Sequence, residues 1–145
     1  MKKLFLSTIL SVLIAAASFA ADLNKNAEAV YNFNAQFERA ENVSWTSTRG
    51  FAKASFTLNN KQMAAFYQPD GSLIGTTSAV TLEELPVIAK RSFAKKYSDY
   101  TVKEAIRFDA TDETAYFISA EDEARSLILK VSAEGMVSVY KSVKK

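Results

Sequence analysis

The sequence predicts an α+β fold in which helices cover one face of an antiparallel sheet. Two segments carry apolar residues at helical spacing, and the segments after each of them alternate apolar and polar residues. Short turns join the alternating segments, which is typical of an antiparallel meander. Because a helix followed by four strands occurs twice, we expect two tandem helix-plus-four-strand antiparallel units, with sub-repeats at about residues 26–80 and 81–145.

The first half is predicted to begin with a helix over residues 26–40, capped by Asn24 or Asn26. Its apolar stripe recurs at spacings of three and four residues, at Val30, Phe33, Phe37 and Ala40. The period then changes to two, which predicts strands at Val43–Thr48, Phe51–Leu58, Lys61–Gln68 and Leu73–Val80.

The second half starts at Thr81–Glu84, a predicted tight turn with capping-box spacing. A helix is expected over Pro86–Tyr97, because proline suits the first helical position. Alternation predicts four further strands, at Thr101–Asp109, Thr114–Ala120, Ser126–Ser132 and Met136–Val143.

The first twenty residues have the pattern of a secretory signal peptide. Lys2 and Lys3 precede an almost wholly apolar run, and Ser18-Phe19-Ala20 places small residues at the positions read by signal peptidase. We therefore expect a mature chain of residues 21–145, a single domain that is periplasmic or secreted and has no membrane span after cleavage. Loss of the two lysines leaves sixteen basic and sixteen acidic residues, so nucleic acid is not an expected partner.

The chain contains no cysteine and no histidine, which excludes several kinds of site. A disulfide framework, a thiolate nucleophile and imidazole-based metal or triad chemistry are all ruled out. The acidic turns around Asp109, Asp112 and Glu113 and at Glu121–Glu123 do not match a calcium loop. We predict no cofactor, no metal and no enzymatic activity.

The order of short motifs resembles the secreted PepSY-like family of Bacteroidetes, which is described as similar to β-lactamase inhibitor protein. The motifs, spread over nearly the whole mature chain, are Asn42–Trp45 (NVSW), Ala54–Phe56 (ASF), Phe66–Gly71 (FYQPDG), Leu85–Pro86 (LP), Lys96–Tyr100 (KYSDY) and Ala115–Ile118 (AYFI).

This resemblance implies that the strands form a curved sheet with the helices on one face and an open concave face. In the inhibitor, that face and its hairpin tips bind an enzyme. The present chain lacks the cysteines for the inhibitor's disulfides, so the resemblance carries over the fold and the binding surface but not the target.

Strand alternation assigns the side chains of the second half to two faces. The face expected to meet the helices holds Phe108, Phe117, Leu129 and Val139. The opposite face is expected to carry Lys103, Arg107, Tyr116, Ile118, Ile128, Lys130, Met136 and Tyr140, and it is more aromatic than a solvated face. A side chain there either anchors a partner or forms cross-strand pairs that stabilise the sheet.

The candidate partner-binding residues are Tyr116, Arg107, Lys130, Tyr140, Tyr67, Trp45 and Asp70. Trp45 could face either the core or a partner. Asp70 has two interpretations, because Pro69-Asp70-Gly71 is a favoured turn and the resembling inhibitor places an acidic residue on a hairpin that enters its target.

These observations predict a small, non-enzymatic binding module whose partner is a protein of the envelope or the exterior, such as an enzyme that it restrains. One alternative is an envelope accessory protein that binds a small ligand, which a closed apolar cavity would support. Another is a carboxylate-based hydrolase, which would need two carboxylates converging in a deep pocket. The sequence predicts neither the partner's identity nor the oligomeric state.

Overall fold

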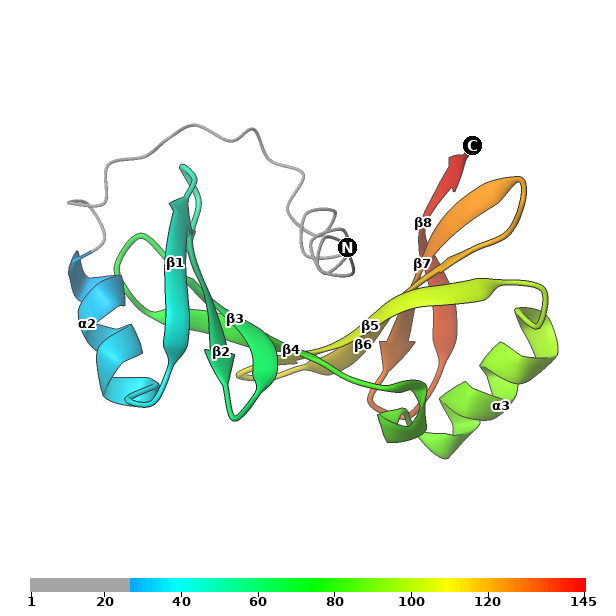
Figure 1. Ribbon diagram of the computed structural model, residues 1–145, viewed down its shortest axis with the longest axis horizontal. Helices are drawn as coiled ribbons and strands as arrows, with labels where there is room; N and C mark the ends of the chain where they lie inside the picture. Colours follow the sequence, from blue (N-terminus) through cyan, green and yellow to red (C-terminus); the bar gives the residue numbers. More distant parts are fainter. Residues whose placement is uncertain (1–26) are drawn as a thin grey trace. The chain divides into compact units, whose positions relative to one another are not determined.

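The structure is a computed structural model that describes residues 27–145 (Figure 1). The predicted signal peptide, its cleavage site after Ala20 and the capping residues Asn24 and Asn26 lie outside the described residues. In the described part of the chain, no helix is long and apolar enough to cross a membrane.

The described chain is mostly an eight-stranded antiparallel sheet, in which the strands follow one another in sequence order from β1 to β8. The strands are β1 (Glu41–Ser47), β2 (Ala52–Leu58), β3 (Lys61–Tyr67), β4 (Leu73–Ala79), β5 (Thr101–Ala110), β6 (Thr114–Glu121), β7 (Arg125–Ser132) and β8 (Val137–Lys144).

Within residues 27–145 two short helices accompany the sheet, α2 (Ala27–Gln36) and α3 (Val87–Lys96), each of ten residues. Helix α2 ends before the predicted residue 40, and Ala40 N instead donates to Phe37 O at 3.0 Å in a turn. A 3₁₀ turn, η2 (Leu82–Glu84), precedes α3. Its Glu84 carboxylate accepts the Thr81 N–H at 2.7 Å, which is the bond expected of the predicted capping box.

The predicted fold class is wrong. Instead of two tandem helix-plus-four-strand units, the strands form one sheet with two short helices. In the described residues one continuous sheet has its edges at β1 and β8, whereas a break in pairing between two units would expose the backbone groups of two further strands. Strand alternation shows where strands are, but it carries no information about where a sheet ends.

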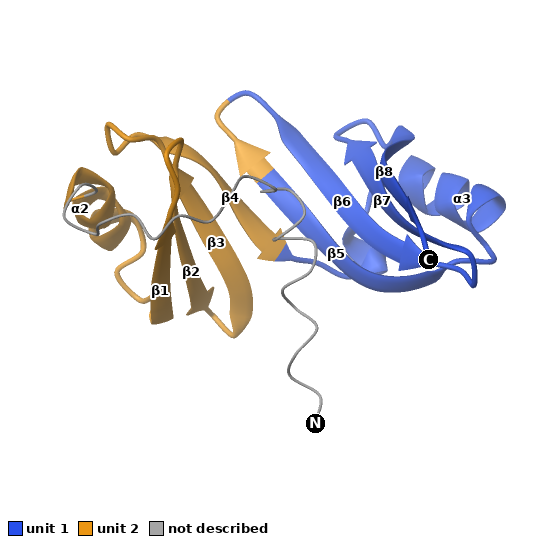
Figure 2. Cartoon of the chain, turned by 90° about the horizontal axis from the view of Figure 1, so that it is seen from above, with its two compact units in different colours: residues 1–15, 79–108, 112–145 blue, residues 16–78, 109–111 orange. Residues whose placement is uncertain are grey.

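The chain divides into two compact units (Figure 2). One comprises Ala79–Phe108 and Asp112–Lys145. The other comprises the described residues up to Ser78 together with Asp109–Thr111, so the tip of the β5–β6 hairpin groups with the first half of the chain.

Helix α2 packs on strands β1–β3 through a cluster rich in aromatic rings, here called the α2 cluster. Phe33 lies at its centre, with ring centroids 5.0 Å from Phe56, 5.2 Å from Phe37 and 5.4 Å from Trp45. The buried members are Ala29, Phe33, Ala52, Ala54, Phe56, Ala65 and Tyr67. Alternate positions of β2 contribute to it, which confirms the alternation predicted for that strand.

Helix α3 packs on β5–β7 through a mainly aliphatic cluster, here called the α3 cluster. Its buried members are Leu85, Ala89, Ala105, Ile118, Leu127, Leu129 and Val131. Phe93 and Tyr97 of the helix region and Tyr116 of β6 pack against it while remaining partly exposed. The α3 cluster fixes which face of these strands is covered by the helix.

Each helix begins against a glycine in a hairpin turn. A Cβ atom on Gly71 would lie 2.5 Å from Glu28 Cβ, and one on Gly135 would lie 3.0 Å from Ile88 Cβ. Both glycines have positive φ, +84° and +92°, a conformation that costs little for glycine alone. Asn32 Nδ2 also donates to Gly71 O at 2.8 Å, which ties α2 to the β3–β4 turn.

Candidate functional site

The face of β5–β8 away from α3, here called the far face, carries a second apolar cluster. Its buried members are Ile106, Ala115, Phe117 and Ile128, with Phe108 packed against them. All five come from strands, and within residues 27–145 no helix contributes to this cluster. These side chains are themselves buried, so the part of this face that a partner can contact is formed by the exposed residues beside them.

The pairing of β6 with β7 assigns side chains to the two faces. Directly opposed residues share a face, and Phe117 opposes Lys130 while Ile118 opposes Leu129. Lys130 therefore lies on the far face with Phe117, whereas Ile118 and Leu129 belong to the α3 cluster.

Tyr140 lies on the far face at a β-bulge. Ile128 opposes Lys141 and Leu129 opposes Val139, so Tyr140 is an extra residue in β8. Its ring contacts Phe117 edge to face, with centroids 5.4 Å apart and an interplanar angle of 81°. The side chain remains 52% exposed, which leaves much of this aromatic surface accessible.

Ion pairs flank the apolar cluster. Lys130 Nζ bonds the Glu113 carboxylate, and Glu121 accepts from Lys103 at 2.7 Å and from Lys145 at 3.2 Å. Hydrogen bonds from Lys103 and then Lys145 hold the pKa of Glu121 below its ordinary value. The far face thus has an apolar centre with charged groups beside it, a composition common in protein-binding surfaces.

The structure places Lys130 and Tyr140 on the predicted side of the sheet but moves other candidates. Tyr116 packs against the α3 cluster, so its predicted position away from the helix is wrong. Phe117 and Phe108 lie on the far face instead of meeting the helix. Ala105 belongs to the α3 cluster and Ile106 to the far face, so alternation places Arg107 on the α3 side. Its predicted position away from the helix is therefore also wrong.

The reason for these errors is that both faces of β6 carry large apolar residues. Tyr116 and Ile118 alternate with Ala115 and Phe117, so hydrophobicity alone cannot say which set meets the helix. The register of β6 against β7 decides it, and a shift of one residue exchanges the two sets. The alternation predicted for Met136–Val143 likewise gave no sign of the bulge at Tyr140.

Two of the candidates, Tyr67 and Trp45, lie in the α2 cluster. Tyr67 is fully buried, and its hydroxyl donates to Gln36 Oε1 at 3.0 Å. Burial raises the pKa of Tyr67 to about 12. Trp45 is half-buried, with its ring centroid 6.0 Å from that of Tyr67, so its orientation, which the sequence left open, is toward the core.

Asp70 lies in the β3–β4 turn and bonds within it. Its Oδ1 accepts the Ser72 hydroxyl at 2.6 Å and the Ser72 N–H at 2.9 Å. The hydroxyl bond and then the backbone bond lower the pKa of Asp70 from its ordinary value. These contacts and the positive φ of Gly71 account for Pro69-Asp70-Gly71 as a turn.

The carboxylates of the described chain do not form a metal centre: residues 27–145 contain no group of three or more metal-binding side chains that could hold an ion. Asp122, for example, accepts the N–H groups of Ala124 and Arg125 at 2.8 Å and 2.6 Å. These bonds organise the β6–β7 turn.

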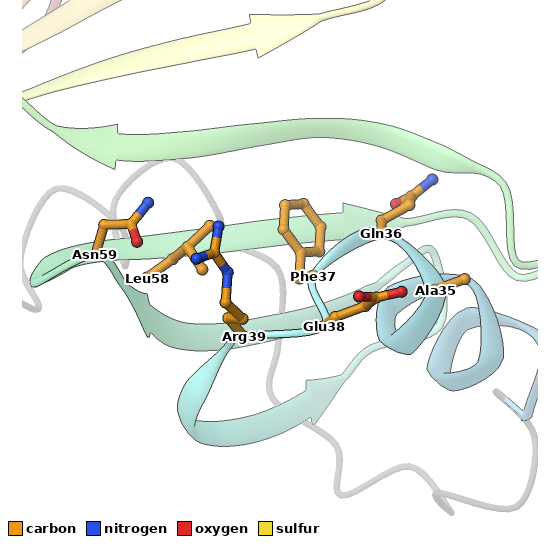
Figure 3. A pocket seen from close by; sticks show the side chains of 7 residues that line it. All are labelled: Ala35, Gln36, Phe37, Glu38, Arg39, Leu58 and Asn59. Atoms are coloured by element: carbon orange, nitrogen blue, oxygen red, sulfur yellow. The ribbon is translucent and has the colours of Figure 1, made fainter.

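A pocket of about 230 Å³ lies at the end of α2 (Figure 3). Phe37 and Leu58 provide its apolar part, and its other lining residues, Ala35, Gln36, Glu38, Arg39 and Asn59, are exposed. It is therefore not the closed apolar cavity expected for a small-ligand protein, and Glu38 is its one carboxylate, whereas a hydrolase needs two.

No protein-family model and no curated protein sequence matches the chain. Solved structures match its fold. A protein of Bacteroides eggerthii whose description provisionally places it in the periplasm gives a TM-score of 0.73 at 16% identity, covering 87% of this chain and 89% of that chain. A DUF2874 family protein of Bacteroides ovatus gives 0.71 at 16% identity, covering 81% and 86%.

A BLIP-like protein of Bacteroides fragilis gives a TM-score of 0.67 at 12% identity, covering 81% of this chain and 84% of that chain. Identities this low establish a shared fold. The predicted likeness to BLIP-like proteins is thus confirmed at the level of the fold, and membership of the PepSY-like family stays a prediction.

Proposed function

We propose that this protein is a non-enzymatic binding module of the periplasm or the cell exterior, and that it binds a protein partner through the far face. The observation that carries the proposal is the exposed ring of Tyr140, which rests on a buried apolar cluster of Ile106, Phe117 and Ile128 to which no helix of the described residues contributes. The shared fold with a BLIP-like protein and with a protein provisionally placed in the periplasm supports it.

Tyr140 is the proposed anchor of this surface. It is about half exposed and its ring rests edge to face on Phe117, so part of the ring is held in place before binding. Tyrosine is enriched among residues that dominate binding energy, and loss of such an anchor typically costs about 2 kcal/mol or more. Lys130 lies on the same face and contributes charge beside the anchor.

Asp70 is proposed to act as a turn residue, since its bonds to Ser72 account for it. Tyr67, Trp45 and Tyr116 belong to the packing of the two helices, so they are not part of the proposed surface. Arg107 is exposed on the other side of β5 and is also left out.

The test compares two exposed apolar side chains of one protein. The mature chain, Tyr140→Ala and Val87→Ala are immobilised, and captured proteins from the periplasmic and secreted fractions of the source cells are identified by mass spectrometry. Val87 on α3 is 58% exposed, close to the 52% of Tyr140, and therefore serves as the matched control.

We expect one partner to be retained by the wild type and by Val87→Ala but bound at least about tenfold more weakly by Tyr140→Ala. The melting temperature of Tyr140→Ala should change little, because half of its side chain is exposed. Equal capture by all three proteins would place the binding surface elsewhere, and capture lost only in Val87→Ala would assign it to α3.

A further inference from the structure

Strand β8 is an edge of the sheet, and its exposed backbone groups are arranged for adding a strand. It is the last strand in the order β1–β8, and every residue from Ser138 to Lys144 is exposed. An edge strand presents N–H and C=O groups that can pair with an extended segment of another protein.

The register shows which groups point outward. Lys145 N donates to Ala124 O at 3.0 Å, which makes these two residues a hydrogen-bonded pair. The pairing continues with Arg125 opposite Lys144, Ser126 opposite Val143 and Leu127 opposite Ser142. Hydrogen-bonded and non-hydrogen-bonded pairs alternate in an antiparallel ladder, so the backbone groups of Val143 face β7 while those of Ser142 and Lys144 face outward.

Charge indicates what kind of strand fits this edge. Residues 137–145 contain Lys141, Lys144 and Lys145 and no acidic side chain. Lys145 pairs with Glu121, but neither Lys141 nor Lys144 has an ion-pair partner among the described residues. An antiparallel pair of β8 strands centred on this run would bring the lysines of two copies together, so the edge disfavours a second copy.

The opposite edge, β1, is less suited to strand addition. Its pairing with β2 is irregular between Glu41 and Ser44, and Asn42 there has a positive φ of 52°. In β8, the irregularity lies at Tyr140, so Lys141–Lys144 remains a regular run. The two edges therefore differ in both regularity and charge.

We infer that the Lys141–Lys144 run of β8 binds an acidic extended segment of a partner protein by strand addition. The backbone groups of Ser142 and Lys144 supply the new hydrogen bonds, and Lys141 and Lys144 select acidic side chains. Its hydrogen bonds come from backbone groups at the sheet edge, whereas the side chain of Lys141, opposite Ile128, lies on the far face next to Tyr140.

The experiment uses the mature protein and two synthetic peptides of about nine residues, long enough for one strand. In one peptide glutamate alternates with valine, and in the other lysine replaces each glutamate. Affinity is measured by fluorescence anisotropy at low and high salt. We expect the acidic peptide to bind at least about tenfold more tightly than the basic one, and less tightly as salt rises.

The decisive variant is Ser142→Pro, with Ser142→Ala as its matched control. Proline removes an outward N–H while leaving the bonds to β7 intact, a position at which edge strands tolerate it. Ser142→Pro should weaken the acidic peptide about tenfold, and Ser142→Ala should not. Lys141→Glu takes the net charge of the run from that of two lysines to zero and should abolish the peptide preference, whereas Lys61→Glu in β3 makes the same charge change without doing so.

Amide hydrogen exchange gives a readout that does not depend on any variant folding. On adding the acidic peptide, the Ser142 and Lys144 amides should become protected, while Val143, already bonded to β7, should change little. The proposal is overturned if these two amides stay unprotected, if Ser142→Pro binds like the wild type, or if both peptides bind equally. It is also overturned if ultracentrifugation shows the wild type pairing with itself in a way that Ser142→Pro abolishes.

Discussion

The α2 cluster and the α3 cluster solve the same packing problem with different side chains. Each holds a ten-residue helix against strands, with a positive-φ glycine under the first turn of the helix. The α2 cluster relies on the rings of Phe33, Phe56 and Tyr67, whereas the α3 cluster is built mainly from leucine, isoleucine, valine and alanine. Similar local geometry therefore does not need a similar core.

The strands under the two helices differ on their other face. In β2, the residues that alternate with the buried ones are Lys53, Ser55 and Thr57, which are polar and half-buried. In β6, the residues that alternate with Tyr116 and Ile118 include the buried Ala115 and Phe117. Strands β5–β7 thus pack an apolar cluster on each face, and the exposed Tyr140 rests on the cluster away from α3, which is why we place binding on that face.

The largest effect should come from removing the centre of the aromatic cluster. Phe33 contacts three other rings, so Phe33→Ala leaves a cavity that its neighbours cannot fill and should cost about 3–5 kcal/mol in the free energy of unfolding. Leu129→Ala in the α3 cluster should cost about 2–5 kcal/mol. Urea denaturation followed by far-UV circular dichroism measures both.

The single tryptophan separates the two clusters in that experiment. Trp45 contacts Phe33, so its fluorescence should change in folded Phe33→Ala but not in folded Leu129→Ala. The comparison fails if Leu129→Ala alters the native Trp45 emission, or if Phe33→Ala costs no more than about 1 kcal/mol.

The two glycines under the helices should differ in their tolerance of alanine. At Gly71 an added Cβ would lie 2.5 Å from Glu28 Cβ, whereas at Gly135 the nearest atom is 3.0 Å away. Both substitutions force alanine into a backbone conformation with positive φ. Gly135→Ala should therefore lower the free energy of unfolding by about 1–2 kcal/mol, and Gly71→Ala, which also has the closer contact, by about 3 kcal/mol. Thermal denaturation of both variants measures the difference.

Gly50→Ala is the control, because no atom lies within 4 Å of an added Cβ there. It should leave the melting temperature nearly unchanged. If Gly71→Ala proved as mild as Gly50→Ala, the contact between the β3–β4 turn and α2 would not be a fixed part of the fold.

The sequence predicted elements better than it predicted their arrangement. The stripe of Val30, Phe33 and Phe37 and the alternation in Phe51–Leu58 correctly located α2 and β2, because each of these segments buries one side. Alternation failed in Thr114–Ala120, where both sides are apolar. The extent of the sheet depends on pairing between segments, which a local pattern does not record.

The candidate site divides in the same way. Lys130 was assigned to the correct face because β7 has clear leucines on the other side, at Leu127 and Leu129. Tyr116 was misassigned because nothing in AYFIS marks the helix-facing residues. Tyr67, predicted to bind a partner, is instead buried beneath α2. The sequence could not show this, because a tyrosine in a strand gives no local sign of whether its hydroxyl contacts solvent or another side chain.

A smaller effect is expected from the hydroxyl that joins α2 to β3. Tyr67→Phe removes its bond to Gln36 Oε1 and should cost about 1 kcal/mol, with the ring still packed. Tyr31→Phe is the matched control, since Tyr31 lies in α2, the helix that contains Gln36, and is 72% exposed. Chemical denaturation of the two variants should separate them, and equal stabilities would show that the bond contributes nothing.

The smallest effect concerns two carboxylates, one in the turn beneath each helix. Hydrogen bonds from the Ser72 hydroxyl and N–H lower the pKa of Asp70 from its ordinary value, and a bond from Ser132 lowers the pKa of Glu134 from its ordinary value. A carboxyl whose pKa is lower in the folded state stabilises the protein above its unfolded pKa. That contribution is lost as the pH falls through the folded pKa, so each turn should weaken in acid.

Both groups are fully exposed, so the change should be small and similar in the two turns. Melting temperatures measured between about pH 2 and pH 6 should fall less steeply for Asp70→Asn and Glu134→Gln than for the wild type. Ser72→Ala should resemble Asp70→Asn, because it removes the larger cause of the shift. An acid-side slope unchanged in Asp70→Asn but reduced in Glu134→Gln would mean that only the turn beneath α3 is held by its carboxylate.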